Sequence, residues 1–186
     1  MEARSEPVVA SARGPFLAHL RTALERHGQL DRVRKRLTRA ARAALDGASP
    51  EAWVDERLIV EVLDTARSTL GDDARWRALL VEESAAAIQR FYRVFLRYVT
   101  PGMLFLALPK MWSMTHRTGT LTARWVDERR VRVEYRDHPP LLARAYQELT
   151  VAVLEALLGL NRTRATVEPG PSPRPDEVFT VEVRLG

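Results

Sequence analysis

Apolar residues recur at helical spacing through the first part of the chain, and this pattern predicts a helical N-terminal half. Helices are expected over residues 15–27 and 30–46. The sequence Ser49-Pro50-Glu51 combines a capping hydroxyl, a proline and an early acid, so it predicts the start of a third helix that runs to the next Gly-Asp pair.

Two further helices are expected before the periodicity changes. Asp72-Asp73 predicts the start of the first, which reaches residue 99 with an interruption near residue 83. Thr100-Pro101 predicts the start of the second. Pro109 lies inside this last run and is expected either to kink it or to split it, because proline cannot donate a helical hydrogen bond.

After Gly119 the apolar positions alternate with polar ones, which is typical of strands. A short Asp-Glu-Arg connection indicates that the first two strands form a β-hairpin. A proline pair then precedes a long apolar segment of helical spacing, and a proline-rich loop separates two last alternating runs. The expected elements are strands over 120–126 and 130–135, a helix over 141–158, and strands over 164–168 and 178–185.

This order predicts an α+β fold, in which a helical N-terminal half precedes a β-β-α-β-β four-stranded antiparallel sheet. At 186 residues the chain is expected to form one domain. We assign residues 1–13 to a flexible leader and residues 14–186 to the α+β domain. Within that domain residues 14–118 form the helical part and residues 119–186 the sheet part.

The amino-acid composition excludes some kinds of site and some locations. The absence of cysteine excludes disulfides and thiolate metal sites. There is no apolar leader of signal-peptide length and no uninterrupted run of 18 apolar residues, so we expect a cytoplasmic protein without a transmembrane segment.

The net charge of +5 lies entirely in residues 1–48, which hold ten basic against five acidic side chains. A basic surface is expected on the second helix. It could be a solvated helix face, a contact for an acidic protein or anionic membrane surface, or, least favoured, a nucleic-acid contact, since no recognition motif accompanies it. The residues are Arg32, Lys35, Arg36, Arg39 and Arg42.

No catalytic or metal-ligating motif is recognisable. The four histidines form no HExxH pair, and no nucleophile elbow, phosphate-binding loop or dinucleotide fingerprint is present. His116 is expected either at the surface before a turn or in a pocket, and His138 in the turn before Pro139. We therefore expect no enzymatic activity, no catalytic residue and no metal site.

Aromatic residues concentrate between residues 91 and 146, and plain core packing is the simplest interpretation. The alternative is a largely apolar ligand pocket in which tyrosine hydroxyls orient the ligand. The expected pocket residues are Tyr92, Phe95, Met111, Trp112 and Tyr146.

From residue 91 to its end the chain resembles the superfamily of haem–NO-binding (H-NOX) and 4-vinyl-reductase domains, which includes TRAPP-type trafficking subunits. Its length and helical N-terminal half also resemble an uncharacterised family restricted to myxobacteria that lies near this superfamily. The resemblance is carried by structural motifs: Thr100-Pro101, Leu108-Pro109-x-x-Trp112, Gly119, and the link from Tyr135 to Pro139.

The resemblance implies a helical lobe over a four-stranded sheet, with a buried pocket for an apolar or tetrapyrrole-like ligand. Haem-binding members carry Tyr-x-Ser-x-Arg to hold the propionates, and a proximal histidine on the preceding helix. Here Asp137 stands in place of the serine and Pro139 in place of the arginine, and an acid beside propionates would repel them. We therefore expect neither haem nor another cofactor.

The preferred hypothesis is a non-enzymatic small-molecule-binding, sensory or adaptor module of a bacterial signalling system, with an apolar pocket between helices and sheet. A homodimer or a partner protein is compatible with it. The alternatives are a TRAPP-like interaction scaffold without a ligand and, less favoured, a nucleic-acid-associated regulator that uses the basic surface.

Overall fold

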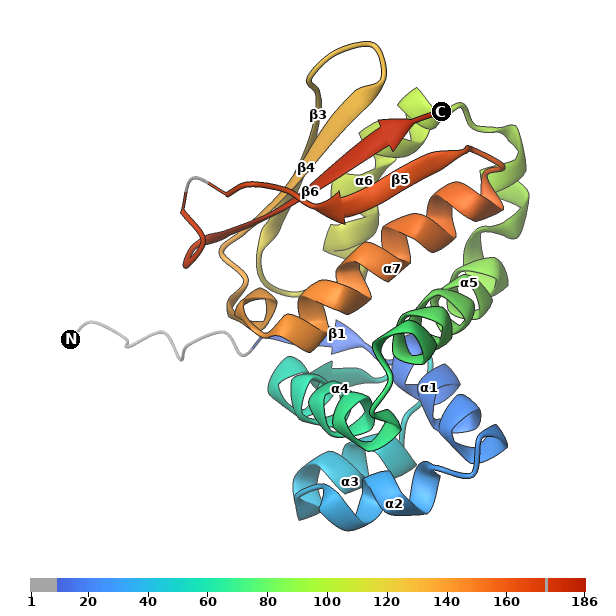
Figure 1. Cartoon of the computed structure of the whole chain (residues 1–186), viewed down its shortest axis with the longest axis vertical. Helices are drawn as coiled ribbons and strands as arrows, with labels where there is room; N and C mark the ends of the chain where they lie inside the picture. Colours follow the sequence, from blue (N-terminus) through green and yellow to red (C-terminus); the bar gives the residue numbers. More distant parts are fainter. Residues whose placement is uncertain (1–9, 173) are drawn as a thin grey trace, which may run out of the picture.

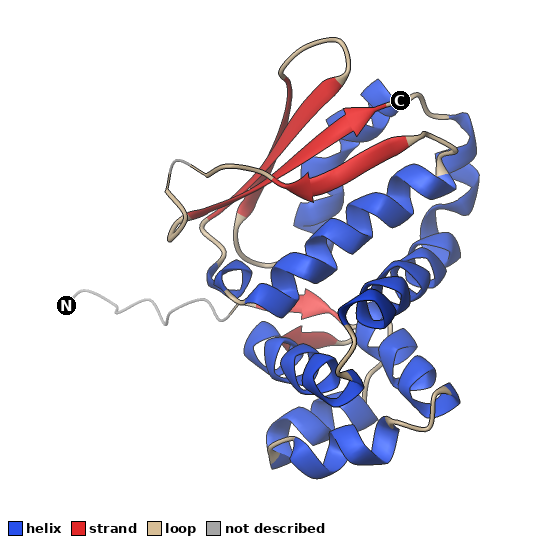
Figure 2. Cartoon of the chain, in the orientation of Figure 1, coloured by secondary structure: helices blue, strands red, loops and turns tan. Residues whose placement is uncertain are grey.

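The computed structural model describes residues 10–172 and 174–186, without the side chains of Arg90, Phe91, Arg93, Phe95 and Arg97. A helical part is followed along the chain by a four-stranded sheet with its own long helix, which confirms the expected α+β class (Figures 1 and 2). Within the described residues, no helix combines the length and apolarity that crossing a bilayer requires.

Side-chain caps mark the starts of four of the described helices. Thr38, Asp55, Asp72 and Thr100 each precede a helix and accept a hydrogen bond from a backbone N–H of its first turn. The helices before the sheet are α1 (Pro15–Arg26), α2 (Leu30–Arg36), α3 (Arg39–Asp46), α4 (Glu56–Leu70), α5 (Asp73–Tyr98) and α6 (Pro101–Thr115).

Several of the predicted helices differ from the structure. The segment 30–46 is not one helix but two, because Leu37 is extended and Thr38 caps a new start. The helix expected from Ser49 begins only at Glu56, because residues 53–55 form a strand and Asp55 supplies the cap. The interruption expected near residue 83 is absent from α5, and α6 continues through Pro109.

A second, two-stranded sheet joins parts of the chain that are distant in sequence. β1 (Ser11–Arg13) pairs antiparallel with β2 (Trp53–Asp55), and Ala12 also bridges to His116 at the end of α6. Residues 11–13, which we assigned to a flexible leader, are therefore ordered in a strand; residues 1–9 lie outside the described residues. In Figure 1 the pair lies between the helical part below and the sheet part above.

The sheet part follows the predicted order. Its strands are arranged β3-β4-β6-β5 with antiparallel neighbours, α6 packs on β3, and α5 packs along α7. The helix expected from residue 141 begins later, after a 3₁₀ turn at the proline pair. The elements are β3 (Thr120–Trp125), β4 (Arg130–Arg136), η1 (Pro139–Leu142), α7 (Arg144–Leu160), β5 (Ala165–Pro169) and β6 (Val178–Leu185).

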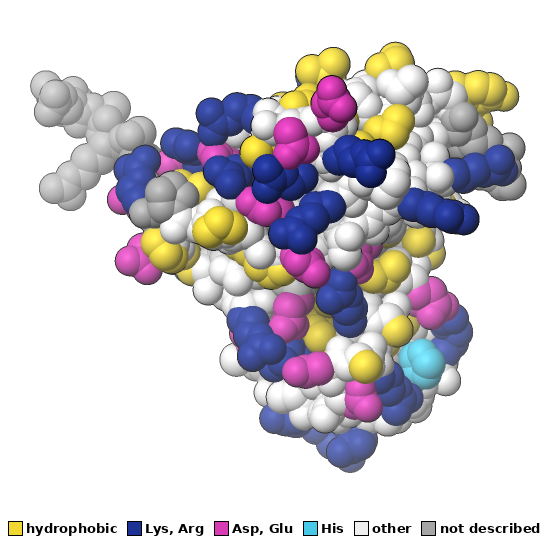
Figure 3. Space-filling model, turned by 45° about the horizontal axis from the view of Figure 1, so that its top comes forward, with side chains coloured by type: hydrophobic (Ala, Val, Ile, Leu, Met, Phe, Trp, Pro, Cys, Tyr) yellow, Lys and Arg dark blue, Asp and Glu magenta, His cyan; other side chains and the backbone are white. Residues whose placement is uncertain are grey.

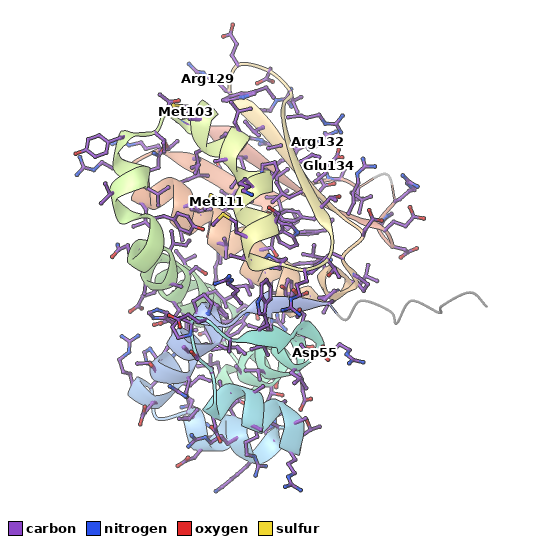
Figure 4. All side chains as sticks on the ribbon, turned by 180° about the vertical axis from the view of Figure 1, so that it is seen from behind. Asp55, Met103, Met111, Arg129, Arg132 and Glu134 are labelled. Carbon is purple, nitrogen blue, oxygen red and sulfur yellow. The ribbon has the colours of Figure 1, made fainter. Side chains whose placement is uncertain are left out.

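The two faces of this sheet differ in character. Val131, Val133 and Tyr135 of β4 are buried in the hydrophobic core. On β4 the alternate residues make ion pairs: Arg132 with Glu182 of β6 at 3.0 Å, and Glu134 with arginines of β3 and β4 (Figure 4).

Asn161 ties the ends of two long helices together. It follows the last turn of α7, and its side-chain amide donates to the backbone carbonyls of Leu96, at 2.8 Å, and Val99, at 2.9 Å. These carbonyls lie at the end of α5 and have no hydrogen-bond partner within the helix. The amide of Asn161 satisfies them in place of water. The end of α7 is thereby fixed to the turn between α5 and α6.

Gly119 should tolerate alanine less well than Gly28. Its φ is +77°, and an added Cβ would lie 2.6 Å from Cβ of His138 and 3.0 Å from the carbonyl oxygen of Arg136. Gly28 has a similar φ of +63° but open space around it, so Gly28→Ala isolates the cost of the left-handed backbone, about 1 kcal/mol. In urea denaturation we expect Gly119→Ala to lose clearly more stability than Gly28→Ala; equal losses would show that the contact with His138 is easily relieved.

Candidate functional site

A large pocket lies where the two parts of the fold meet. Its volume is about 560 Å³, within the range of small-molecule sites. The walls come from the start of α1, the β1–β2 region, α5, the end of α6 and α7, and most of the lining side chains are apolar. They include Phe16, Trp53, Ile59, Ile88, Leu149 and Val153.

A smaller pocket of about 170 Å³ lies between α5, α6, α7 and the sheet. Tyr92, His116 and Tyr146 line both pockets, so the two share a wall. Met111 and Trp112 line only the smaller one, on the part of α6 that faces the sheet; Figure 4 labels Met111 there.

Four of the five pocket residues expected from the sequence are therefore distributed over the two pockets. The side chain of Phe95 lies outside the described part of the structure. The other four line one pocket or both, and their contact with a ligand stays a prediction.

One polar group in the larger pocket lacks a partner. Ser84 of α5 lines the pocket, is 2% exposed, and its hydroxyl has no hydrogen-bond partner among the described residues. A buried hydroxyl without a hydrogen bond costs about 1–3 kcal/mol. A ligand with a polar atom at this position would remove that cost.

His116 occupies the junction of the two pockets. Its ring stacks on Trp112 with centroids 3.6 Å apart and planes 4° from parallel. Nδ1 lies 3.4 Å from the carbonyl oxygen of Trp112, which can only accept, and Nε2 lies 3.3 Å from the hydroxyl of Tyr146. Burial, and secondarily the nearby His138, lower the pKa of His116 to about 3, so the ring is neutral at physiological pH.

The side chains of His138 and Glu56 lie next to His116 and are fully buried. Nε2 of His138 is 2.7 Å from Oε2 of Glu56, and Nδ1 of His138 is 3.1 Å from the hydroxyl of Thr118. The backbone N–H of Glu56 donates to the carbonyl of Ala10 at 3.0 Å, which fixes the start of α4 against the strand pair. Burial, followed by the charge of Glu56, raises the pKa of Tyr146 well above its usual value, so its phenol stays protonated.

The cluster of Glu56, His116 and His138 is the main feature that sequence reasoning missed. One nitrogen or oxygen from each of these residues lies within 4.8 Å of the others. A signal was available: β3 and β4 are antiparallel, so residues just outside the two strands must lie together, and His116 precedes β3 while His138 follows β4. Glu56 gave no such signal, because an acid in the first turn of a helix is common for electrostatic reasons.

The basic surface expected on one helix is divided between α2 and α3 at the far end of the helical part (Figure 1). Its five side chains are exposed. Arg36 donates to the hydroxyl of Thr69 at 3.0 Å, and Arg42 donates to the carbonyl of Arg34 at 3.0 Å, so part of this charge stabilises the helical part itself. Binding of an anionic partner here stays a prediction.

No protein-family model and no curated protein sequence matches the chain, but solved structures do. An Fe(II) unliganded H-NOX protein from K. algicida has a TM-score of 0.67 at 10% identity, covering 94% of this chain and 96% of that one. A mutant of the T. tengcongensis H-NOX has a TM-score of 0.61 at 14% identity, covering 93% and 97%. An oxygen-binding H-NOX domain related to soluble guanylate cyclases, in its oxygen complex, has a TM-score of 0.59 at 11% identity and covers 92% of each chain.

The chain therefore has the H-NOX fold, as the sequence resemblance indicated. The identities are low, so this likeness establishes the fold and leaves the ligand open.

The residues present do not fit a haem. Asp137 is exposed in a left-handed conformation, and Pro139 lies in η1, so neither position offers a donor for a propionate.

Proposed function

We propose that this protein is a non-enzymatic sensory or adaptor module of a bacterial signalling system that binds a small, largely apolar molecule. The pocket of about 560 Å³ between its helical and sheet parts carries this proposal. The apolar lining favours apolar ligands, and the hydroxyl of Ser84 would orient a polar atom of the ligand. The H-NOX fold supports the proposal by analogy only.

The position of the pocket suggests how occupancy would be transmitted. β1 connects the two parts, because Ala12 bridges to His116 and the backbone N–H of Arg117 donates to the carbonyl of Ser11 at 3.0 Å. The guanidinium of Arg117 also lies 4.4 Å from the ring centroid of Trp53, a pocket residue of β2. A ligand that contacts both parts would favour one packing of the helices against the sheet, which is a population shift.

Native mass spectrometry of the gently purified protein tests the proposal. A small molecule that leaves the protein only on denaturation supports it. An unliganded monomer that also fails to bind an apolar fluorescent probe such as anilinonaphthalene sulfonate contradicts it.

Filling the pocket should abolish binding of that probe. Ala87 of α5 lines the pocket and is 8% exposed, so Ala87→Phe places a ring in the space that a ligand would occupy. We expect at least a tenfold loss of probe affinity in a fluorescence titration. The matched control is Ala43→Phe on α3, where the side chain is exposed and lines none of the described pockets. Equal affinity of the two variants would place the probe elsewhere.

A second function, that of an interaction scaffold, is favoured by one specific observation. Large apolar side chains are exposed at the end of α5 and in the first half of α6: Val94, Tyr98, Met103 and Leu106, with Tyr98 82% and Leu106 81% exposed. We call this group the α5–α6 apolar surface; apolar side chains also stand out along the upper edge of the molecule in Figure 3, and Figure 4 labels Met103 on α6. The same mass spectra distinguish the functions, because a scaffold would appear as a ligand-free oligomer.

A further inference from the structure

Three potential metal ligands meet at the junction of the helical and sheet parts. Glu56 begins α4, His116 follows the last residue of α6, and His138 precedes η1. One ligand atom from each lies within 4.8 Å of the other two, and the side chains of Glu56 and His138 are fully buried. Two imidazoles and one carboxylate suit divalent transition metals such as zinc and iron.

The buried carboxylate is not accounted for by protein contacts. Neither oxygen of Glu56 has a hydrogen-bond partner among the described residues, and Nε2 of His138 has none either. Nε2 and Oε2 are only 2.7 Å apart, close enough for an ion pair, but their alignment does not meet that of a hydrogen bond. An imidazole that donates must point its N–H at the acceptor, so this short contact is not a hydrogen bond.

Nε2 of His138 and Oε2 of Glu56 lie close enough to be neighbouring ligands of one ion. With metal–ligand bonds of about 2.1 Å, the ligand atoms around a tetrahedral zinc ion lie roughly 3.4 Å apart. The three ligand atoms here lie within 4.8 Å of one another, so the widest separation would shorten by at most about 1.4 Å on binding one ion.

The outer nitrogens of both imidazoles have the partners that metal-bound histidines usually have. Nδ1 of His116 lies 2.9 Å from the hydroxyl of Thr115 and 3.4 Å from the carbonyl of Trp112. Nδ1 of His138 lies 3.1 Å from the hydroxyl of Thr118. With the proton on Nδ1, the lone pair of each Nε2 is available to an ion, and at His116 the ion would replace the 3.3 Å contact between Nε2 and the hydroxyl of Tyr146.

We propose that Glu56, His116 and His138 bind one divalent transition-metal ion of the zinc type. The ion would satisfy the buried carboxylate and join α4 and the hairpin ends into one unit. Because His116 also lines both pockets, the ion would lie in the wall of the ligand site. The proposal does not depend on the apolar ligand, since the cluster is complete without it.

The test uses the full chain without a histidine tag, stripped with a chelator and titrated with Zn²⁺ by calorimetry, and with Co²⁺ by visible absorption. One ion should bind per chain, and bound Co²⁺ should show d–d bands. Glu56→Gln and His138→Gln each remove a ligand. Loss of a hydrogen-bond partner of a metal ligand alone lowers metal affinity roughly 10–100-fold. We therefore expect each variant, which loses a ligand itself, to bind Zn²⁺ at least about 100-fold more weakly. His27→Gln is the control, because His27 is exposed at the end of α1.

A variant that fails to fold would not decide the matter, so Thr118→Val provides a milder one. It keeps the shape of the side chain and removes only the partner of His138 Nδ1, and roughly tenfold weaker binding is expected. Absence of Zn²⁺ binding to the stripped protein, or binding that is unchanged in Glu56→Gln and Thr118→Val, would overturn the proposal and leave Glu56 and His138 as a structural pair.

Discussion

Saturating Zn²⁺ is expected to raise the thermal stability of the chelator-treated protein by roughly 10 °C. An ion present at a thousand times its dissociation constant stabilises the folded state by about 4 kcal/mol. For a chain of this size, each kcal/mol shifts the melting temperature by roughly 2–4 °C. Differential scanning calorimetry at increasing Zn²⁺ measures the effect.

The variants make this result specific to the proposed ligands. Glu56→Gln should remove most of the shift, whereas His27→Gln should keep all of it. Mg²⁺ should give no shift, because it prefers an all-oxygen shell and keeps several waters. An equal shift in Glu56→Gln would assign the stabilisation to another site and contradict the proposal.

Trp76→Ala is expected to lower the free energy of unfolding by about 3–5 kcal/mol, the usual cost of truncating a buried tryptophan. Trp76 is 2% exposed in the core, and its indole N–H donates to a carboxylate oxygen of Glu148 on α7 at 2.9 Å. The substitution therefore leaves a cavity and removes a link between α5 and α7. Urea denaturation at constant pH measures the loss.

The same substitution at Trp125 provides the control. Trp125 ends β3, is 47% exposed, and contacts Phe105 edge to face with ring centroids 5.8 Å apart. Trp125→Ala should therefore cost no more than about 1 kcal/mol, close to the worth of an exposed aromatic pair. A loss at Trp76 as small as that expected at Trp125 would mean that the packing between α5 and α7 contributes little to stability.

The sheet part could be predicted almost completely because its strands are long enough to alternate. Val131, Val133 and Tyr135 repeat every second residue, and this period has no helical explanation. Helix caps were equally informative where no strand follows them: Asp72 and Thr100 begin helices as expected. In contrast, Ser49-Pro50-Glu51 resembles a helix start, but residues 53–55 pair with β1 first.

The site could be predicted only in part, because its polar members come from distant segments. Three-residue strands such as β1 carry too short a pattern to be recognised, so nothing indicated that Ala12 would bridge to His116. The aromatic and apolar lining follows from composition, and Tyr92 and Tyr146 line both pockets. The proximity of Glu56 to the two histidines depends on how α4 packs, which no local pattern encodes.

The amide of Asn161 has a mechanical consequence. Leu149 and Val153 of α7 border the larger pocket, and two turns farther along the same helix Asn161 grips the carbonyls at the end of α5. α7 therefore runs from the wall of the larger pocket to the base of the α5–α6 apolar surface. A ligand that tilts α7 would therefore also displace Tyr98 and its neighbours, which are exposed on the surface of the molecule.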